Sequence, residues 1–562
     1  MLPVFGAPCI MTAPMESHCL SFREIPHTTK LFSTYLEDFN QVSPYYAHPP
    51  TASGVDASSR EVRLDSGVRR AVVEILREQN RAFGPSGEID PATSRNLDRL
   101  ASGAVAIVTG QQVGLFSGPA YTFYKALSAV RVAEETTRRG TDAVPVFWLA
   151  TEDHDLAEIN HSSWCTHSGL ARYELAPQPQ SEGRRVGEVL LGDAIEAVVS
   201  ASASTLEGPF AGDITRALHE SYTPRDTYSS AFGKLIARLL AGHGIIFLDQ
   251  LDPRLHRLLA PIFTHVLRKA AELRDALLVR AKELEDASLH AQVKVTRETT
   301  LLFSIISGRR QPVRSRNGGF VAGDAELSAS QLVDAIQRAP EGFSPSALLR
   351  PVVQDTILPT AAYVGGPAEI AYLAQSQVVY QSLGVRMPAI LPRSSFTIIE
   401  PPIARFLAQY DLDLRDLLAG RQHLRAKMEQ KSITGSLASQ FDAGEVQLRH
   451  LITSFEEPLA KLDSTLAESL RSAEAKMLHQ FTQLRGKAAR AANFRSGVLD
   501  RHERILIDSL APHGELQERT LCLLPVLASY GPALLDELTR FSSLAGADGG
   551  RSCATQHQIL SI

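Results

Sequence analysis

Apolar residues in the first 400 positions gather into five short runs, each beside a glycine-containing or polar turn. The units that contain them span residues 104–110, 144–151, 243–253, 359–375 and 386–395. Runs that are apolar at nearly every position are typical of strands buried on both faces of a parallel sheet. Because helical segments separate most of the runs, the pattern predicts an α/β fold with a doubly wound parallel sheet. An α+β fold with antiparallel pairs is the structural alternative.

Two stretches interrupt this alternation of strands and helices. Residues 161–240 mix short polar strands with helix, and the residues from 288 onward form strands around a basic, glycine-containing turn. We expect both stretches to be small subdomains inserted into the core. The expected core segments are then 15–160, 241–287 and 346–400, and the expected insertions are 161–240 and 288–345.

Residues 401–505 are rich in Leu, Ala, Glu, Lys, Gln and Arg, and their apolar positions recur every three or four residues. One stripe on a long helix contains Leu459, Leu462, Leu466, Leu470, Ala473, Met477, Phe481 and Leu484. The SITGS segment at 432–436 breaks the helical pattern, which predicts two long helices folded back as a hairpin, with a closing helical segment at 506–541. A helix packed on its own domain is the alternative. The length favours a protruding coiled coil whose stripe pairs with that of a second copy, so we expect a homodimer.

The two ends of the chain lack periodic apolar patterns. Residues 1–14 have neither a basic region nor an apolar stretch typical of a signal peptide, and we expect a disordered or misannotated start with folding from about Met15. Residues 542–562 are small, polar and aperiodic, which predicts a disordered tail.

Composition narrows the functional classes. Hydrophobic residues make up 44% and the net charge is -5, so the chain has enough apolar material for a large core and lacks the basic surplus of nucleic-acid-binding proteins. No apolar run approaches the ~20 residues of a membrane-spanning helix. The five cysteines are scattered without a CxxC motif, which predicts neither a disulfide framework nor a cysteine-based zinc site. We therefore expect a cytoplasmic protein without nucleic-acid or membrane partners.

The segment 109–125, TGQQVGLFSGPAYTFYK, joins the first predicted strand to a helix. Gly110, Gly114 and Gly118 permit positive φ and close backbone approach, and the N–H groups at a helix start attract phosphate or carboxylate. Ser117 and Thr122 add hydroxyl donors. These five residues are the candidate cofactor-binding set, although the segment matches neither GxGxxG nor the P-loop. A tight turn without a ligand is the alternative.

TEDHDLAEIN (151–160) follows the second predicted strand, at the edge where ligands bind in open α/β sheets. His154 is the candidate general base, with Asp153 and Asp155 as its catalytic partners, and Glu152 is a candidate substrate-binding residue. Asp153 and Asp155 are alternatively suited to Mg²⁺ that bridges nucleotide phosphates, so a metal site stays open. The structural alternative is a helix N-cap with acidic residues in its first turn.

Three further candidates for substrate binding lie after later strands. Glu369 belongs to the first turn of a predicted helix, where it suits an ammonium group, and Arg393 and Ser394 suit an anion. The segments 290–295 and 308–316 form a basic hairpin, which is either a solvated turn or a phosphate contact.

Together, TGQQVGLFSGPAYT, FWLATEDHDLAEIN, GGPAEIAYLAQ, PAILPRSS and LPVLASYGPALL resemble the bacillithiol biosynthesis cysteine-adding enzyme family, from about Met15 to Phe541. The resemblance implies a ligase that joins cysteine through an amide to glucosaminyl-malate in the last step of the pathway. It also implies a Rossmann-like core related to class I aminoacyl-tRNA synthetases, with connecting-peptide-like insertions and a coiled coil that forms a dimer. Uphill amide formation makes ATP the expected co-substrate, with Mg²⁺ as a candidate companion.

The chain departs from class I synthetases in three respects. The turn that opens the first helix reads GLFSGP and lacks their His-x-Gly-His motif, no KMSKS-like loop is present, and the cysteines of a cysteine-selecting zinc site are missing. The resemblance therefore supports the substrate class better than it supports an adenylate mechanism. The alternatives are a nucleotidyltransferase acting on another small acid, and a coiled-coil scaffold with a degenerate nucleotide-binding core.

Overall fold

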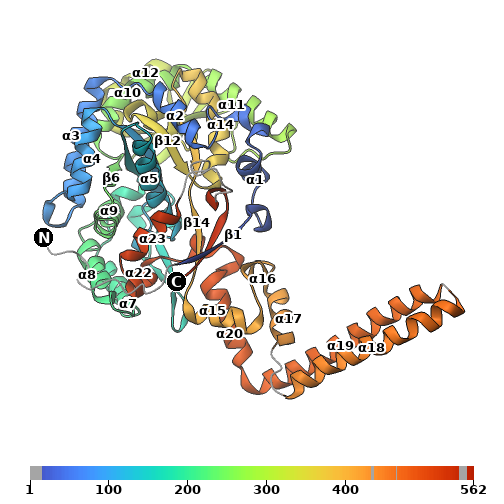
Figure 1. The fold of residues 1–562 in the computed structure, drawn as a ribbon. Coiled ribbons are helices and arrows are strands. Elements are labelled where there is room, and N and C mark those ends of the chain that lie inside the picture. The colour runs from blue at the N-terminus through green and yellow to red at the C-terminus, as the bar shows by residue number, and fades with distance from the viewer. Residues whose placement is uncertain (1–14, 432–435, 464, 543–552) are drawn as a thin grey trace. The chain divides into compact units, whose positions relative to one another are not determined.

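A computed structural model describes residues 15–431, 436–463, 465–542 and 553–562 (Figure 1). The chain forms two compact units. The first comprises Met1–Thr397 and Glu518–Leu560, and the second comprises Ile398–Gln517 and Ser561–Ile562. The expectation of a disordered or misannotated start at 1–14 concerns residues outside the described part.

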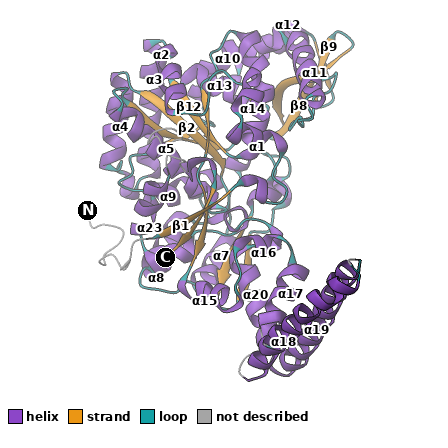
Figure 2. Cartoon of the chain, turned by 45° about the vertical axis from the view of Figure 1, so that its right-hand side comes forward, coloured by secondary structure: helices purple, strands orange, loops and turns teal. Residues whose placement is uncertain are grey.

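A five-stranded parallel sheet forms the core of the first unit, with helices on both faces (Figure 2). Each strand overlaps one of the five apolar units, so the predicted α/β fold is confirmed and the antiparallel alternative is wrong. In spatial order the strands are β13 (Ala389–Pro392), β12 (Thr360–Gly365), β2 (Val105–Gln112), β3 (Ala143–Ala150) and β6 (Ile246–Asp249).

The strand order reverses beside β2. The chain runs outward from β2 to β3 and β6, and then crosses back to form β12 and β13 on the other side. In open α/β sheets, ligands bind outside the carboxyl ends of the strands at such a switch point. The fold therefore directs attention to the carboxyl ends of β2 and β12.

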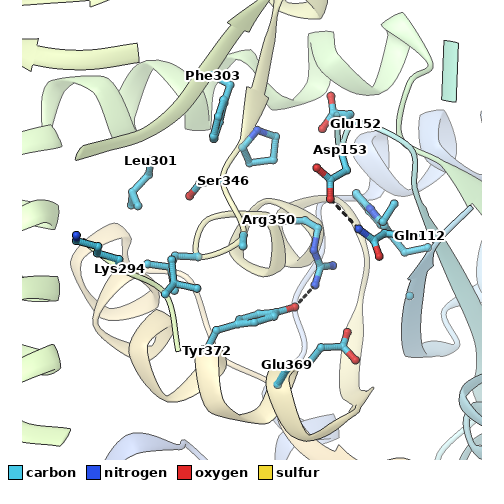
Figure 3. A pocket seen from close by; sticks show the side chains of 18 of the residues that line it. Gln112, Glu152, Asp153, Lys294, Leu301, Phe303, Ser346, Arg350, Glu369 and Tyr372 are labelled. Carbon is cyan, nitrogen blue, oxygen red and sulfur yellow. Dashed lines mark hydrogen bonds between the residues drawn. The ribbon is translucent and has the colours of Figure 1, made fainter. Parts of the chain in front are cut away.

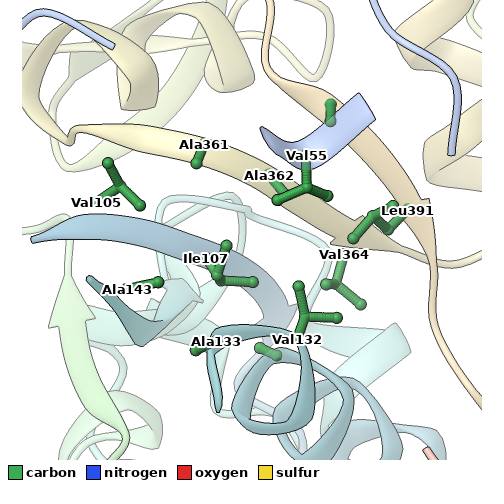
Figure 4. Packing of buried hydrophobic residues seen from close by; sticks show 12 residues of the cluster. Val55, Val105, Ile107, Val132, Ala133, Ala143, Ala361, Ala362, Val364 and Leu391 are labelled. Atoms are coloured by element: carbon green, nitrogen blue, oxygen red, sulfur yellow. The ribbon is translucent and has the colours of Figure 1, made fainter. Parts of the chain in front are cut away.

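Buried branched side chains hold helices onto this sheet. Val105 and Ile107 of β2 belong to one cluster with Val132 of α5 (Tyr121–Arg138) and Val55 of α2 (Ala52–Glu61) (Figure 4). Full burial of such a side chain stabilises the fold by about 1.5–3 kcal/mol. The cluster therefore gives the switch point a rigid support.

Several helices of the first unit begin after a side chain that satisfies free N–H groups of the first turn. Asp65 and Asp90 accept hydrogen bonds from the first turns of α3 and α4, and Pro91 occupies the first position of α4. Other helices of the first unit are α1 (Lys30–Glu37), α3 (Ser66–Phe83), α4 (Pro91–Ser102), α6 (Leu156–Ile159), α10 (Pro253–Arg268), α11 (Ala270–Asp286), α13 (Arg350–Ile357), α14 (Pro367–Leu383), α22 (Leu524–Tyr530) and α23 (Ala533–Phe541), and α21 (Gln517–Thr520) begins at the boundary of the unit.

Two groups of elements interrupt the core. The first contains the antiparallel pair β4 (His161–Thr166) and β5 (Gly169–Glu174), followed by α7 (Ala194–Ala203), α8 (Ala211–Ser221) and α9 (Tyr228–Leu239). The second is an antiparallel sheet with the order β10 (Ala325–Leu327), β9 (Gly319–Ala322), β8 (Arg309–Arg316), β7 (Thr299–Ile306) and β11 (Phe343–Pro345), together with α12 (Ala329–Arg338).

The end of the chain corrects one prediction. Instead of a disordered tail over the whole of 542–562, the described residues 553–562 include β15 (His557–Ser561), which lies between β1 (Glu16–Leu20) and β14 (Ser395–Ile399) in a three-stranded sheet. The strand is short and its partners come from distant parts of the chain. Local periodicity therefore gives no indication of it.

A disulfide bond joins Cys19 of β1 to Cys553. The scattered cysteines predict no disulfide framework, and this bridge is an exception to that expectation. The two residues are 534 positions apart, so only the pairing of terminal strands brings them together. Because disulfides are uncommon in a reducing cytosol, the cytoplasmic location stays a prediction.

The second unit is helical. It contains α15 (Pro401–Tyr410), α16 (Leu414–Leu418), α17 (Arg421–Lys431), α18 (Ser436–Leu462), α19 (Leu466–Ser496) and α20 (Val498–Leu510). The helices α18 and α19 pack against each other as a hairpin.

The position of the hairpin turn differs from the prediction. Periodicity places the stripe from Leu459 to Leu484 on one helix, but α18 ends at Leu462 and α19 starts at Leu466. The Asp463 carboxylate accepts hydrogen bonds from the N–H and the hydroxyl of Thr465, both at 2.8 Å, which favours a turn there. The predicted break at 432–436 lies outside the described residues except for its last position.

None of the helices in the described part of the chain has the length and apolar content that crossing a membrane would require.

Candidate functional site

A cavity of about 730 Å³ opens at the switch point of the first unit (Figure 3). Gly110–Gln112 at the end of β2 and Gly366–Glu369 after β12 form part of its lining. The antiparallel sheet contributes Phe303 and Arg310. The volume suits small-molecule ligands, and the position is the one that the sheet topology predicts.

Acidic groups after β3 form one side of the cavity. Glu152, Asp153 and Glu158 are all in the lining. Glu152 is buried and accepts a hydrogen bond from Nε2 of His256 at 2.7 Å. Burial lowers the pKa of His256, but the hydrogen bond and the charge of Glu152 outweigh it and raise the pKa. His256 therefore holds and orients the Glu152 side chain.

Asp153 is held as a carboxylate by several donors. Burial alone would raise its pKa, but hydrogen bonds from His154 and Gln112 and the charge of Arg310 hold the pKa well below its usual range. Gln112 Nε2 donates to Asp153 at 2.9 Å and to Glu158 at 2.8 Å. Asp153 is therefore a permanent negative charge and a weak proton acceptor.

His154 lies outside the cavity lining. Its Nδ1 accepts a hydrogen bond from Nη1 of Arg310 at 3.1 Å, and its ring faces Phe303 with the ring centroids 6.1 Å apart. The Arg310 guanidinium lies 3.7 Å from the Phe303 ring centroid. The base role predicted for His154 stays untested, and in this geometry its contact is with a cation of the cavity wall.

Asp155 is a helix cap. It precedes α6 and accepts a hydrogen bond from the N–H of Glu158 at 3.3 Å, while its side chain is exposed. The structure thus separates the three predicted catalytic residues, since Asp153 alone belongs to the cavity lining.

Glu369 lines the cavity but already has a cationic partner. It forms an ion pair with the buried Lys125, accepts a hydrogen bond from the Tyr363 hydroxyl at 2.5 Å, and caps α14 through the N–H of Gly366. Lys125 also donates to the carbonyl of Gly110 at 2.9 Å. The ammonium-binding role predicted for Glu369 would have to compete with Lys125.

Arg350 lies near the centre of the view in Figure 3, at the start of α13. Its Nη2 donates to the hydroxyls of Tyr372 at 2.5 Å and Tyr363 at 3.2 Å. Burial lowers the pKa of Arg350, but attraction to Tyr363, Tyr372 and Glu369 outweighs it and raises the pKa. The residue is a permanent cation of the cavity wall.

Arg393 and Ser394 are predicted to bind an anion of the substrate, but a carboxylate of the protein itself already binds Arg393. Arg393 lines the cavity, but its guanidinium is bound at both ends by the buried Glu518, at 2.7 and 2.9 Å. Ser394 lies outside the lining, and its N–H donates to Ser128. No local pattern points to Glu518, because its partner is 125 positions away.

The glycine turn is packed inside the protein rather than open to the cavity. Gly114, Ser117, Gly118 and Thr122 are absent from the lining, whereas Gly110 belongs to it. The N–H groups of Gly114, Phe116, Gly118, Ala120 and Thr122 donate to other groups of the protein. Phosphate binding at the turn requires free N–H groups, so the structure gives this part of the cofactor prediction no support.

Gly110 is required for close strand packing. A Cβ atom there would lie 2.9 Å from the Trp148 carbonyl oxygen on β3. The residue therefore brings the end of β2 against its neighbour and leaves its own carbonyl for Lys125.

Four residues with a clear place at the site were not predicted: Gln112, His256, Arg350 and Tyr372. Gln112 and Tyr372 lie inside motifs that were quoted for other residues, so position after a strand could have indicated Gln112. His256 and Arg350 have no local signal, because their partners come from other elements. The basic segments 290–295 and 308–316 contribute Val293–Val295, Arg310 and Pro312–Arg314 to the cavity wall.

Within the described residues, no group of three or more His, Cys, Asp and Glu side chains is arranged to hold a metal ion. The acidic side chains of the cavity are instead held by Gln112, His256 and Arg310. A role for Mg²⁺ therefore stays a prediction.

Two family models match the chain in succession. Residues 15–394 match the N-terminal Rossmann-like domain of BshC of bacillithiol biosynthesis, and residues 396–545 match its C-terminal coiled-coil domain. A solved structure of Mycobacterium tuberculosis methionyl-tRNA synthetase in complex with methionyl-adenylate covers 80% of this chain at 9% identity and a TM-score of 0.20, which is too low to carry an argument.

Curated relatives match over nearly the full length. Proteins named "Putative cysteine ligase BshC" are 40% identical in Koribacter versatilis, over 98% of this chain and 100% of the relative, and 36% identical in Solibacter usitatus, over 92% and 96%. A third, from Salinibacter ruber, is 30% identical over 90% and 93%. The fold, the cavity at its switch point and these matches agree: the chain belongs to the BshC family of bacillithiol biosynthesis.

Proposed function

We propose that this protein is a ligase that joins the carboxyl group of cysteine to the amine of glucosaminyl-malate, in the last step of bacillithiol synthesis. Relatives that match almost the whole chain are named "Putative cysteine ligase BshC". The observation that carries the proposal is the cavity at the switch point, which offers carboxylates and cations to substrates that contain both amines and carboxylates.

The acidic side of the cavity suits the amine that attacks. An ammonium group is attracted by the permanent charge of Asp153, whose low pKa makes it a poor proton acceptor. Glu152 is the second carboxylate on this side of the cavity, and the hydrogen bond from His256 holds it in one orientation. We therefore assign Asp153 to binding the amine and Glu152 to receiving the proton that the amine loses as the amide forms.

The carboxyl group of cysteine needs activation, because amide formation from a free carboxylate is uphill in water. We propose ATP as the co-substrate, through an acyl-phosphate or an aminoacyl-adenylate. The cations of the cavity wall, among them Arg310 and Arg350, are suited to phosphate oxygens. The N–H groups of the glycine turn already donate hydrogen bonds within the protein.

Thiol profiling of a deletion strain tests the function. Loss of the gene should abolish bacillithiol and cause glucosaminyl-malate to accumulate, and the plasmid-borne gene should reverse both changes. Normal bacillithiol in the deletion strain, or loss without accumulation of glucosaminyl-malate, would contradict the proposal.

We also propose that the helical hairpin forms a homodimer. Val446, Leu451 and Phe455 of α18 are 67%, 55% and 49% exposed, whereas Leu466 and Leu470 are partly buried. Apolar side chains exposed along one long helix are costly in water, and a second copy would cover them by twofold symmetry.

Light scattering tests the dimer. Replacing Val446, Leu451 and Phe455 together by Lys should give a folded monomer, whereas the matched control Glu445→Lys should stay dimeric. A wild-type monomer at micromolar concentration, or a triple variant that stays dimeric, would contradict the dimer.

A further inference from the structure

Three cations of the cavity lining, Lys125, Arg350 and Arg393, differ in their ion-pair partners. Glu369 pairs with Lys125, and Glu518 pairs with Arg393 at 2.7 Å. Arg350 is the cation left over.

The contacts of Arg350 are with neutral groups. Its guanidinium donates to the hydroxyls of Tyr372 and Tyr363 and to Gln354 Oε1 at 3.4 Å. Tyr363 uses its own hydrogen for Glu369, so it can only accept from Arg350. Within the described residues, no carboxylate forms an ion pair with Arg350 within 4 Å, and Arg350 keeps N–H groups that these three contacts do not use.

The two tyrosines hold the side chain in one orientation. Tyr372 and Tyr363 bind the same nitrogen, Nη2, and the guanidinium carbon lies 5.6 Å from the Tyr363 ring centroid. Both contacts use the N–H groups of Nη2, so the remaining N–H groups of Arg350 can bind an oxyanion through charge-assisted hydrogen bonds. The planar fork of arginine matches the two oxygens of a carboxylate or a phosphate.

We propose that Arg350 binds an oxyanion of a substrate, a carboxylate or a phosphate, and so determines which acid the cavity accepts. This inference rests on the proposed ligase only for the identity of that substrate, whose candidate oxyanions are the malyl carboxylates and the phosphates of ATP. It transfers to Arg350 the anion-binding role that the sequence suggested for Arg393.

Calorimetric titration of the full chain with L-malate, with ATP and with inorganic phosphate tests the proposal. The variant Arg350→Met should bind the responsible probe about 10- to 100-fold more weakly than wild type, since two charge-assisted hydrogen bonds are lost. The variant Arg350→Lys, which keeps the charge but loses the fork, should show an intermediate loss. The control Arg338→Met removes an exposed cation of α12 outside the cavity lining and should bind as wild type does.

The melting temperature separates ligand binding from a structural role. Arg350 has no carboxylate partner among the described residues, so Arg350→Met should melt within a few degrees of wild type without ligand. Weaker binding of L-malate identifies a carboxylate as the oxyanion, and weaker binding of ATP and phosphate identifies a phosphate. Unchanged affinity for every probe in both Arg350 variants, or no binding of any probe by wild type, overturns the proposal.

Product formation in the same preparations keeps the two proposals apart. A wild-type protein that binds an anion through Arg350 but forms no amide product contradicts the ligase and supports the anion site. A wild-type protein that forms the product, with binding unchanged in Arg350→Met, contradicts the anion site and supports the ligase.

Discussion

The parallel sheet of the first unit and the hairpin of the second use apolar residues in opposite ways. Ile107 and Val364 on the sheet are completely buried, whereas Val446 and Leu451 on the hairpin are more than half exposed. The sheet finds all its apolar partners within the chain because helices cover both faces. The exposed side chains of the hairpin have no such cover within the described part of the second unit. The same apolar content therefore stabilises one region and stays exposed in the other, where the proposed dimer would cover it.

Ion pairs also differ in burial between the two regions. Arg393 and Glu518 pair in the interior of the first unit, while Arg449 and Glu445 pair on the surface of α18. A buried charge that loses its partner is destabilising, whereas an exposed pair is screened by water. The difference can be measured directly.

The largest effect is expected from the buried pair. Glu518→Gln should lower the free energy of unfolding of the first unit by about 3–5 kcal/mol, because it leaves the buried Arg393 charge uncompensated. The control Glu445→Gln on the hairpin should change stability by less than about 0.5 kcal/mol. Trp148 and Trp164, the only tryptophans of the chain, lie in the first unit, so denaturant titration followed by their fluorescence reports on it. Equal changes in the free energy of unfolding for Glu518→Gln and Glu445→Gln would contradict the difference between the buried and the exposed ion pair.

Truncation of a core side chain should cause the next largest loss in the free energy of unfolding. Ile107→Ala leaves a cavity between the sheet and its helices and should cost about 2–4 kcal/mol in the same titration. Leu451→Ala on the hairpin should leave the fluorescence transition where it is. A shift with Leu451→Ala as large as that with Ile107→Ala would mean that the hairpin stabilises the sheet.

A smaller effect should appear with pH. Burial lowers the pKa of His557 to about 4, since its two ring nitrogens face the hydroxyls of Ser395 and Thr397 rather than water. Between about pH 6.5 and 4 the unfolded chain binds a proton that the folded chain does not, so stability falls as the pH falls. The loss attributable to His557 at pH 5 is about 2 kcal/mol. Unfolding of wild type and His557→Gln at pH 8 and pH 5 should show a steeper loss for wild type, and parallel losses would contradict the assignment.

The sequence was informative where structure is local. All five core strands could be predicted, because burial on both faces leaves a continuous apolar run. The acidic segment after β3 contributes Glu152, Asp153 and Glu158 to the cavity lining, since a strand that ends in charged residues marks the ligand edge, whereas His154 and Asp155 lie outside the lining.

Long-range pairing accounts for most of what was missed. Glu518 neutralises Arg393, and His256 orients Glu152, across more than 100 positions. The strand β15 pairs with β1 near the start of the chain and with β14 at Ser395–Ile399. The helical stripe was misplaced for a different reason: a turn of a few residues keeps the apolar spacing on either side of it, so periodicity alone cannot locate it.

The most direct test of the central claim, that the cavity at the switch point is the ligase site, is amide formation by two neighbouring variants. Purified wild type, Asp153→Asn and Asp155→Asn would be incubated with cysteine, glucosaminyl-malate, ATP and Mg²⁺, and the product quantified by mass spectrometry. The account predicts that Asp153→Asn lowers kcat/KM at least about 100-fold, because the charge that attracts the amine is lost, whereas Asp155→Asn keeps the cap of α6 and retains wild-type activity. Full activity of a folded Asp153→Asn protein, or equal losses in both variants, would contradict it.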